Sequence, residues 1–255
     1  MSQVSRARHR DRCHLREKLR AMRIVTFNIH HGTLGRRGRV DGEQLADVCA
    51  GFDADVICLQ EVDRSTLRTK GVDLASVVAT RCEMAHRFGS SQRLLGGLYG
   101  NAVLVKGEIA KSTVVRLPKV PRTRFWQEQR TVLETDVVVQ GRQISVWCTH
   151  LAVKQWNNEP QLNMMLQRAS GHDGPLIIAG DLNRRRDAVV RQAAAAGLAV
   201  VDGGATFPVG KPHLDIDHVL YCAHWTVKSH EVRQTPMSDH CALVVDLDYV
   251  GSLGS

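Results

Sequence analysis

The sequence of 255 residues lacks several features that would place it in a special class of protein. It has no run of about 18 apolar residues, so we expect no membrane-spanning helix. Its first residues carry no apolar stretch of the roughly 7–15 residues that a secretory signal needs, and we predict a cytoplasmic location. Its seven cysteines form no C-x-x-C pair, which argues against a zinc ribbon and a disulfide framework. Aromatic residues make up only 5%, too few for an extended platform on which single-stranded bases could stack.

Basic charge is concentrated at the N-terminus. The formal net charge is +8, and residues 1–23 contain eight arginines or lysines against two acidic residues, so the rest of the chain is close to neutral. A basic arm of this kind is able to contact nucleic acid or another acidic surface. Alternatively, translation starts at Met22, directly before the first apolar run. We therefore expect a basic, disordered extension (residues 1–21), one domain (residues 22–249) and a short tail (residues 250–255).

Short runs rich in valine, isoleucine and threonine alternate with helical segments along the chain. These runs predict strands over residues 23–29, 55–59, 101–105, 111–117, 130–139, 143–149, 176–179, 216–221, 225–232 and 242–247. Helices are predicted over residues 42–51, 73–83, 160–169 and 187–196, with Pro160 in a first helical turn. The residues around Gly141 join two of the strands and predict a β-hairpin. Many strands and few helices favour an α/β (α+β) domain in which two sheets pack face to face and helices flank them.

Polar residues stand where the apolar strands end. Each is an acid, an amide or a histidine, the residue types that bind hard cations or move protons. They are Asn28 after RIVTF, Glu61 after DVICLQ, His150 after ISVWCT, Asp181 and Asn183 after PLIIAG, Asp217 within LDIDHVL, and Asp239 with His240 before CALVV. Any one of them has an ordinary structural explanation, such as a helix cap or the solvent end of a strand. The repetition of the pattern indicates a cleft at one edge of the sheets.

The motifs TFNIHHG, ADVICLQEVD, YGNAVLV, THL, IIAGDLN, IDHVL and SDH follow one another between about Met22 and Leu247. In this order they resemble the endonuclease/exonuclease/phosphatase superfamily, which includes deoxyribonuclease I, abasic-site endonucleases, sphingomyelinases and inositol-polyphosphate 5-phosphatases. The resemblance implies a four-layer sandwich of two mostly antiparallel sheets flanked by helices. It also implies a metal-dependent phosphoesterase that attacks a phosphate ester with an activated water.

The resemblance further implies a metal site with Mg²⁺ as the ion and Mn²⁺ as an alternative. Glu61 would be the main ligand, with Asn28 and Asp239 beside the ion. A site with one or two carboxylates suits Mg²⁺, which keeps several waters and binds substrate phosphate.

The catalytic roles that the resemblance implies fall on five further residues. Asp181 would orient or deprotonate the attacking water, and Asn183 would bind a phosphate oxygen or fix that water. His150 and His240 would contact the phosphate, stabilise its charge or protonate the leaving oxygen. Asp217 would accept a hydrogen bond from His240 and hold the orientation of its ring. An Asp–His pair favours the charged imidazole, which suits contact with an anion.

Several neighbouring residues stay undecided from the sequence. His30 and His31 follow Asn28, where other branches of the superfamily place an acidic residue. Either histidine could simply line the cleft without a functional role. Asp215 competes with Asp217 as the partner of His240, although the apolar pattern around Asp217 favours the latter. Arg68, Arg130 and Tyr99 could reach the substrate, but we interpret them as structural or solvated residues.

Three hypotheses about the function remain open. In the first, the chain is a Mg²⁺-dependent phosphodiesterase whose substrate is nucleic acid, which the basic arm favours. In the second, it is a lipid or small-molecule phosphoesterase, for which the loop with Phe125 and Trp126 could meet an apolar group. In the third, it is a non-catalytic protein that binds nucleic acid through residues 1–21; the presence of Glu61, Asp181 and Asp239 argues against a lost active site. No obligate protein partner is evident.

Overall fold

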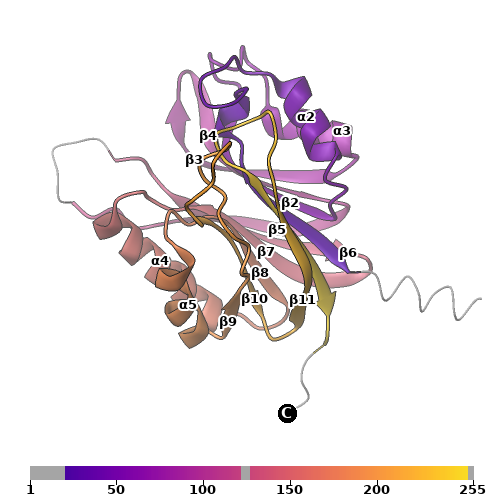
Figure 1. Cartoon of the computed structure of the whole chain (residues 1–255), viewed down its shortest axis with the longest axis vertical. Coiled ribbons are helices and arrows are strands. Elements are labelled where there is room, and N and C mark those ends of the chain that lie inside the picture. Colours follow the sequence, from indigo (N-terminus) through magenta and orange to yellow (C-terminus); the bar gives the residue numbers. More distant parts are fainter. Residues whose placement is uncertain (1–20, 122–126, 252–255) are drawn as a thin grey trace, which may run out of the picture.

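Two six-stranded sheets pack face to face in the computed structural model, which describes residues 21–121 and 127–251 (Figure 1). Two helices cover the outer side of each sheet, so the chain forms four layers, and the predicted sandwich is confirmed. No helix among the described residues is long and apolar enough to cross a membrane. The predicted extension (apart from Ala21), the residues Phe125 and Trp126, and the end of the predicted tail from residue 252 lie outside the described residues.

The first sheet has the strand order β11-β12-β1-β2-β4-β3. Its strands are β1 (Met22–Asn28), β2 (Val56–Arg64), β3 (Ala85–Leu94), β4 (Gly97–Val105), β11 (Trp225–Arg233) and β12 (Ala242–Tyr249). The helices α2 (Gly42–Ala50) and α3 (Leu74–Cys82) cover it, and a short 3-10 turn, η1 (His30–Gly32), follows β1. Asp41 and Asp73 cap the two helices by accepting hydrogen bonds from backbone N–H groups of their first turns.

The second sheet has the strand order β5-β6-β7-β8-β10-β9. Its strands are β5 (Gly107–Arg116), β6 (Thr131–Val139), β7 (Arg142–His150), β8 (Leu176–Asp181), β9 (Leu198–Val200) and β10 (Asp217–Cys222). The helices α4 (Gln155–Ser170) and α5 (Arg186–Ala195) cover its outer face. The predicted hairpin is confirmed: β6 and β7 pair from Val139 and Arg142 outward, around Gln140 and Gly141, both with left-handed φ.

Each sheet contains one parallel pair, and this decides where the polar strand ends meet. β1 runs parallel to β2, and β7 runs parallel to β8, while the other neighbours are antiparallel. The ends of the parallel strands therefore share an edge with the starts of their antiparallel partners β10 and β12. We call this the active-site edge and the other end of the strands the opposite edge.

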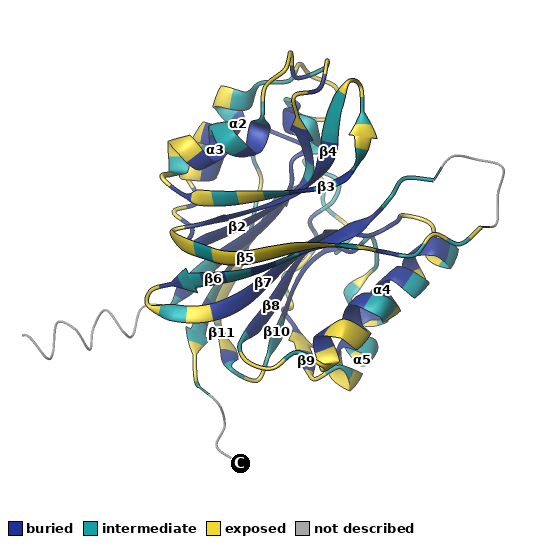
Figure 2. Ribbon diagram, turned by 180° about the vertical axis from the view of Figure 1, so that it is seen from behind, coloured by how far each residue is buried: buried dark blue, intermediate teal, exposed yellow. Residues whose placement is uncertain are grey.

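The central strands are buried on both faces, as Figure 2 shows. Along β1, Ile24 belongs to the core between the sheets, whereas Val25 and Phe27 pack under α2 and α3. A third core lies between the second sheet and its helices α4 and α5. Burial on both faces explains why these strands read as continuous apolar runs rather than as alternating patterns.

Some elements differ from the prediction. β3 was not predicted, because AHRFGSSQRL contains glycine, serine and charged residues and forms an edge strand whose side chains are mostly exposed or half-buried. The short strand β9 was also missed. The prediction for α4 was wrong in its start: the helix begins at Gln155, so Pro160 lies inside it. The buried Asn158 holds that added turn by donating hydrogen bonds to the carbonyl oxygens of Ala152 (2.6 Å) and Leu182 (2.8 Å).

Candidate active site

Asn28 connects the two sheets at the active-site edge. It ends β1 in the first sheet, and its Nδ2 donates to Asp181 Oδ2 at the end of β8 in the second sheet (3.1 Å). The same Nδ2 donates to Glu61 Oε1 (3.2 Å), and Oδ1 accepts from the backbone N–H of His30 (3.1 Å). The amide of Asn28 is thus occupied by protein partners, and it orients two carboxylates from different sheets.

Asp181 is the centre of the site. Its Oδ2 lies 3.4 Å from His150 Nε2 and 3.8 Å from His240 Nε2, in addition to the bond from Asn28. Its Oδ1 accepts from the backbone N–H of Asn183 (2.9 Å). Burial, followed by the repulsion of Asp217, raises the pKa of Asp181 to about 7. A carboxyl with a pKa near neutrality is suited to taking up and releasing a proton.

His240 is held by a second carboxylate. Its Nδ1 lies 2.8 Å from Asp217 Oδ2, and the hydroxyl of Thr206 donates to the same oxygen (2.6 Å). Burial on its own would lower the pKa of His240, but the carboxylates of Asp217, Asp181 and Asp239 raise it to about 10. The imidazole is therefore a cation at neutral pH, with its Nε2 directed to the Asp181 side of the site.

Glu61 lies at a break in the pairing of β2 with β4. The register between these strands shifts between Leu59 and Val62, and Glu61 has a left-handed φ of 59°. This bulge turns its carboxylate into the active-site edge. Burial on its own would raise the pKa of Glu61, but the neighbouring His31, His150 and Asn28 hold it well below its usual value.

A divalent cation fits the donor set at this edge. The carboxylates of Glu61 and Asp239 keep 23% and 19% of their side-chain surface exposed, so both are accessible to solvent. One ligand atom each from His30, His31 and Glu61 lies within 4.8 Å of the others. Carboxylate and imidazole groups are the usual protein ligands of divalent cations, and an open edge leaves room for substrate.

The backbone is strained throughout the site. His30, His31, Glu61, Asn183 and Ser238 all have φ between 43° and 67°, a region that residues with a side chain seldom adopt. Such conformations persist where surrounding contacts fix them, and they gather at functional sites. The hydroxyl of Ser238 is one such contact, because it donates to Asn28 O (2.6 Å) and accepts from His240 N (3.1 Å).

Two residues of the site were missed or undervalued in the sequence. Thr206 carries no local signal, since it lies in the loop between β9 and β10 and does not border an apolar run. Arg130 was interpreted as solvated, yet it is 8% exposed and its Nη2 lies 2.9 Å from Glu128 Oε2. Its charge, after the larger effect of burial, contributes to a pKa of His150 well below the usual value. Arg130 directly precedes β6, so this residue stands at the start of a strand.

The structure also places the other undecided residues. Asp215 lies away from His240 and accepts from the backbone N–H of Arg186 (3.2 Å). Arg68 binds the buried Asp63 through two hydrogen bonds (2.6 and 2.8 Å) and lies 5.8 Å from the ring of Tyr99, so it has a structural partner. His30 and His31 both lie within 4 Å of a site carboxylate.

A model of the Endonuclease/Exonuclease/phosphatase family matches residues 25–240. The chain belongs to this family. It is 28% identical over 216 residues to the uncharacterized protein YbhP of Escherichia coli strain K12, a match that covers 78% of this chain and 84% of that protein. Members of the family are metal-dependent phosphoesterases, and this chain is a phosphoesterase of that class.

Solved structures of the family share the fold. An endonuclease/exonuclease/phosphatase from Beutenbergia cavernae superposes with a TM-score of 0.74 at 23% identity, covering 90% of this chain and 72% of that one. A mannosyl-6-phosphatase from Bacteroides thetaiotaomicron superposes with a TM-score of 0.68 at 14% identity, covering 89% and 99% of the two chains. At these identities the likeness concerns the fold alone.

Proposed function

We propose that the chain hydrolyses phosphodiesters by in-line attack of a water molecule that Asp181 orients and deprotonates. The observation that carries this proposal is the position of Asp181 Oδ2, which Asn28 Nδ2 reaches at 3.1 Å while His150 and His240 stand 3.4 and 3.8 Å away. A buried carboxyl with a pKa of about 7, beside a protonated imidazole, provides a base and an acid at one place.

The remaining residues act on the substrate phosphate in this proposal. His240, charged at neutral pH, stabilises the negative charge that develops on the phosphoryl oxygens and donates a proton to the leaving oxygen. Asp217 and Thr206 keep its ring in position. His150 donates a hydrogen bond as a neutral imidazole, and Asn183 fixes the water or a phosphate oxygen.

The metal site is assigned to Glu61 and Asp239, with Asn28 orienting Glu61. When bound there, a divalent cation neutralises charge on the phosphoryl oxygens. Mg²⁺ is the ion that the family resemblance implies, and Mn²⁺ is the alternative.

Nucleic acid is the substrate class that we place first. Exposed cations that have no carboxylate partner within the described ranges lie at the active-site edge: Arg36, Arg37, Lys70, Lys154 and Lys211 on its loops, and Arg93 near the end of β3. Lysine and arginine side chains that neutralise phosphates supply most of the affinity for a nucleic-acid backbone. The basic residues 1–21 would add to this attraction. A cytoplasmic location stays a prediction of the sequence.

A lipid or small-molecule phosphoester is the second candidate. A groove of about 530 Å³ lies between the loop after η1 and the loop after β2, with an apolar lining from Val40, Val72, Leu74 and Val77. Charged residues line it as well: Arg39, Asp41, Glu43, Arg68 and Lys70. Such a groove suits a substrate with a compact or apolar group beside its phosphate. The mannosyl-6-phosphatase of the same fold is a solved relative whose name indicates a small substrate.

The experiment that tests the proposal is a hydrolysis panel with the full chain and Mg²⁺ or Mn²⁺. The substrates are plasmid DNA, an abasic-site duplex, RNA, bis-p-nitrophenyl phosphate, phospholipid vesicles and sugar phosphates. Glu61→Gln and Asp181→Asn are the active-site variants, and Asp246→Asn is the matched control from the opposite edge.

We expect metal-dependent turnover that both active-site variants lose and the control keeps, with a nucleic acid as the preferred substrate. Preference for a sugar phosphate or phospholipid would move the function to the second candidate. Turnover that survives in both active-site variants would overturn the assigned mechanism. Binding of DNA without turnover, lost when residues 1–21 are removed, would support the non-catalytic reading instead.

A further inference from the structure

The turn after β1 presents two histidines in an uncommon backbone conformation. His30 and His31 have left-handed φ values of 43° and 49° within η1. The turn is fixed by hydrogen bonds from His30 N to Asn28 Oδ1 (3.1 Å) and from Gly32 N to Ile29 O (2.8 Å). Backbone strain that the surrounding contacts maintain is typical of residues that position a ligand.

Both imidazoles face carboxylates of the active site. His31 Nδ1 lies 3.9 Å from Glu61 Oε2, and His30 Nδ1 lies 3.6 Å from Asp239 Oδ1. The two ring centroids are 4.4 Å apart. Both Nδ1 atoms are buried and have no hydrogen-bond partner in the part of the chain that the structure describes. Buried polar atoms are normally satisfied, so these nitrogens are candidates for ligand atoms.

The spacings are too long for hydrogen bonds but close to those of ligands around one ion. A nitrogen–oxygen hydrogen bond measures about 2.7–3.2 Å, which is shorter than either distance. Two ligands bound at about 2.1 Å to the same ion stand roughly 3.0–3.4 Å apart, so side-chain shifts of about half an ångström would suffice. One ligand atom each from His30, His31 and Glu61 already lies within 4.8 Å of the others.

We propose that His30 and His31 are ligands of the divalent cation at Glu61, and that this site therefore prefers a first-row transition-metal ion such as Mn²⁺ or Co²⁺ over Mg²⁺. Two imidazoles and one carboxylate form a donor set that transition metals favour, whereas Mg²⁺ favours oxygen donors and water. The carboxylate of Asp239 lies beside His30 as a further oxygen donor. The exposed side of the site leaves positions for water and substrate.

The other acidic cluster of the site is not an alternative location for this ion. Asp181, Asp217 and His240 also converge. However, Asp217 Oδ2 is already shared by Thr206 and His240, and Asp181 accepts from Asn28 and from the backbone of Asn183. Unpartnered buried nitrogens that point to carboxylates occur together at His30 and His31.

The inference rests on the proposed function only in that it concerns the same site, and it is tested by metal binding without turnover. We would load the metal-free full chain with Mn²⁺ and record pulsed electron paramagnetic resonance, which detects ¹⁴N nuclei directly bound to the ion. A second sample, labelled with [¹⁵N]histidine, shows whether the coupled nuclei belong to imidazoles. Calorimetric titration then gives the affinities for Mn²⁺, Co²⁺ and Mg²⁺.

The variants for the titration are His30→Asn and His31→Asn. Asparagine tolerates left-handed φ better than most residues, so the turn should persist while the imidazole is lost. His230→Asn, at an exposed position of β11, is the matched control. Thermal unfolding of the metal-free variants checks that they fold.

We expect histidine nitrogen coupling in the wild-type protein, and a loss of Mn²⁺ and Co²⁺ affinity of about tenfold or more in each site variant, the order of effect seen when metal sites are altered. Mg²⁺ affinity should change much less, and the control should match the wild type. Mn²⁺ bound without nitrogen coupling would overturn the proposal, and so would an equal loss of Mn²⁺ and Mg²⁺ affinity. Nitrogen coupling in a protein that hydrolyses nothing on the panel would refute the proposed function while leaving this inference intact.

Discussion

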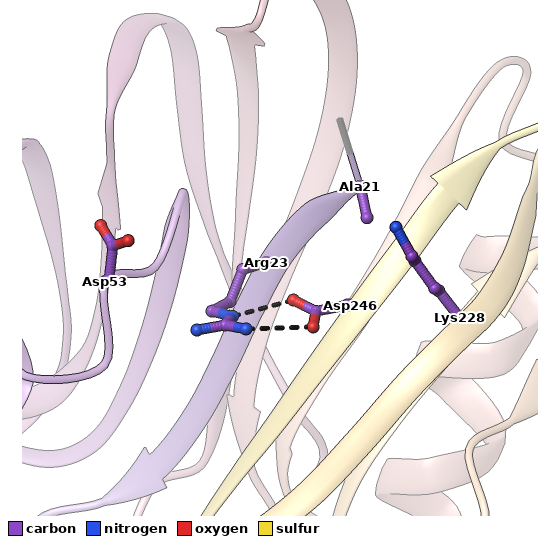
Figure 3. A pocket seen from close by; sticks show the side chains of 5 residues that line it. All are labelled: Ala21, Arg23, Asp53, Lys228 and Asp246. Carbon is purple, nitrogen blue, oxygen red and sulfur yellow. Dashed lines mark hydrogen bonds and ion pairs between the residues drawn. The ribbon is translucent and has the colours of Figure 1, made fainter. Parts of the chain in front are cut away.

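The two edges of the sandwich shift the pKa of an aspartate carboxyl group in opposite directions. At the opposite edge, Asp246 accepts from Arg23 Nε (2.8 Å) and Nη2 (3.1 Å), beside a hollow of about 250 Å³ (Figure 3). The hydroxyl of Ser229 also donates to Asp246 (2.8 Å). The guanidinium of Arg23 lowers the pKa of that carboxyl. At the active-site edge, burial raises the pKa of Asp181 to about 7.

The difference comes from access to water and from the sign of the neighbours. The Asp246 side chain is 20% exposed and has a full cation as its partner, whereas Asp181 is 2% exposed and has another carboxylate nearby. A carboxylate paired with a cation is stabilised in its charged form, and one that is buried beside a like charge is not. At the opposite edge, therefore, the carboxylate is neutralised by a cation, whereas at the active-site edge a buried carboxyl has a pKa that allows it to exchange a proton near neutral pH.

The largest expected difference between the two edges is the effect on kcat of removing the carboxylate. Asp181→Asn preserves the shape of the side chain but removes its ability to accept a proton, and we expect kcat to fall by about 10²–10⁴. Asp246→Asn makes the same chemical change at the opposite edge and should leave kcat unchanged. Steady-state kinetics on a phosphodiester checks both. An Asp181→Asn enzyme within fivefold of the wild type would show that another group takes the proton.

The next effect concerns the orientation of His240. Asp217→Asn removes the carboxylate that holds the ring and its charge, and we expect kcat to fall by about 10² with little change in KM, as for other electrostatic contributors. Thr206→Val should produce a smaller loss in the same direction, because Thr206 acts through Asp217. Thermal unfolding controls for damage to the fold. A rise in KM at constant kcat would instead assign the pair to substrate binding.

A substitution to glycine should change the free energy of unfolding in opposite directions at the two edges. Glu83 ends α3 with a left-handed φ of 54° and an exposed side chain, so Glu83→Gly should raise the free energy of unfolding by about 0.5–1 kcal/mol. Ser238 also has a left-handed φ, of 67°, but its hydroxyl makes two buried hydrogen bonds.

Ser238→Gly should therefore lower the free energy of unfolding by about 1 kcal/mol, since the lost hydrogen bonds outweigh the relieved strain. Chemical denaturation of both variants measures the two changes. Stabilisation by Ser238→Gly would mean that the strain at the active-site edge exceeds the value of the contacts that maintain it.

The smallest expected effect is the pH dependence of the Arg23–Asp246 pair. The folded state lowers the pKa of Asp246 below its unfolded value of about 3.9, so the pair adds stability above that pH. This contribution is lost as the pH falls through the lowered pKa of the folded state. Because the pair is partly exposed, its value should stay below about 1 kcal/mol. Denaturation of wild type and Asp246→Asn should differ at pH 7 and converge as the pH approaches 2; a constant difference would exclude this linkage.

The sequence predicted the central strands better than the edge strands and the helix boundaries. Strands such as β1 and β8 are short apolar runs with abrupt ends, and those local patterns suffice to place them. The strand predicted to end at residue 59 continues as β2 to Arg64, through the bulge at Glu61. The edge strand β3 was missed because its AHRFGSSQRL segment has no buried face strong enough to set a period. The start of α4 was missed because the buried Asn158 binds carbonyls that are distant in sequence, which no local pattern reveals.

By itself, the sequence determined which residue types stand at the strand ends, since apolar runs and the halts that follow them are local properties of the chain. The meeting of Asn28 with Asp181 across two sheets was decided only by the tertiary structure, because it needs the parallel pairs of both sheets to end at one edge. The left-handed backbone that brings His31 and Glu61 together at the active-site edge, and the burial that raises the pKa of Asp181, likewise arise only once distant segments pack together. The residue types of the site are local properties of the sequence, whereas their pKa values and orientations depend on neighbours that only folding brings together.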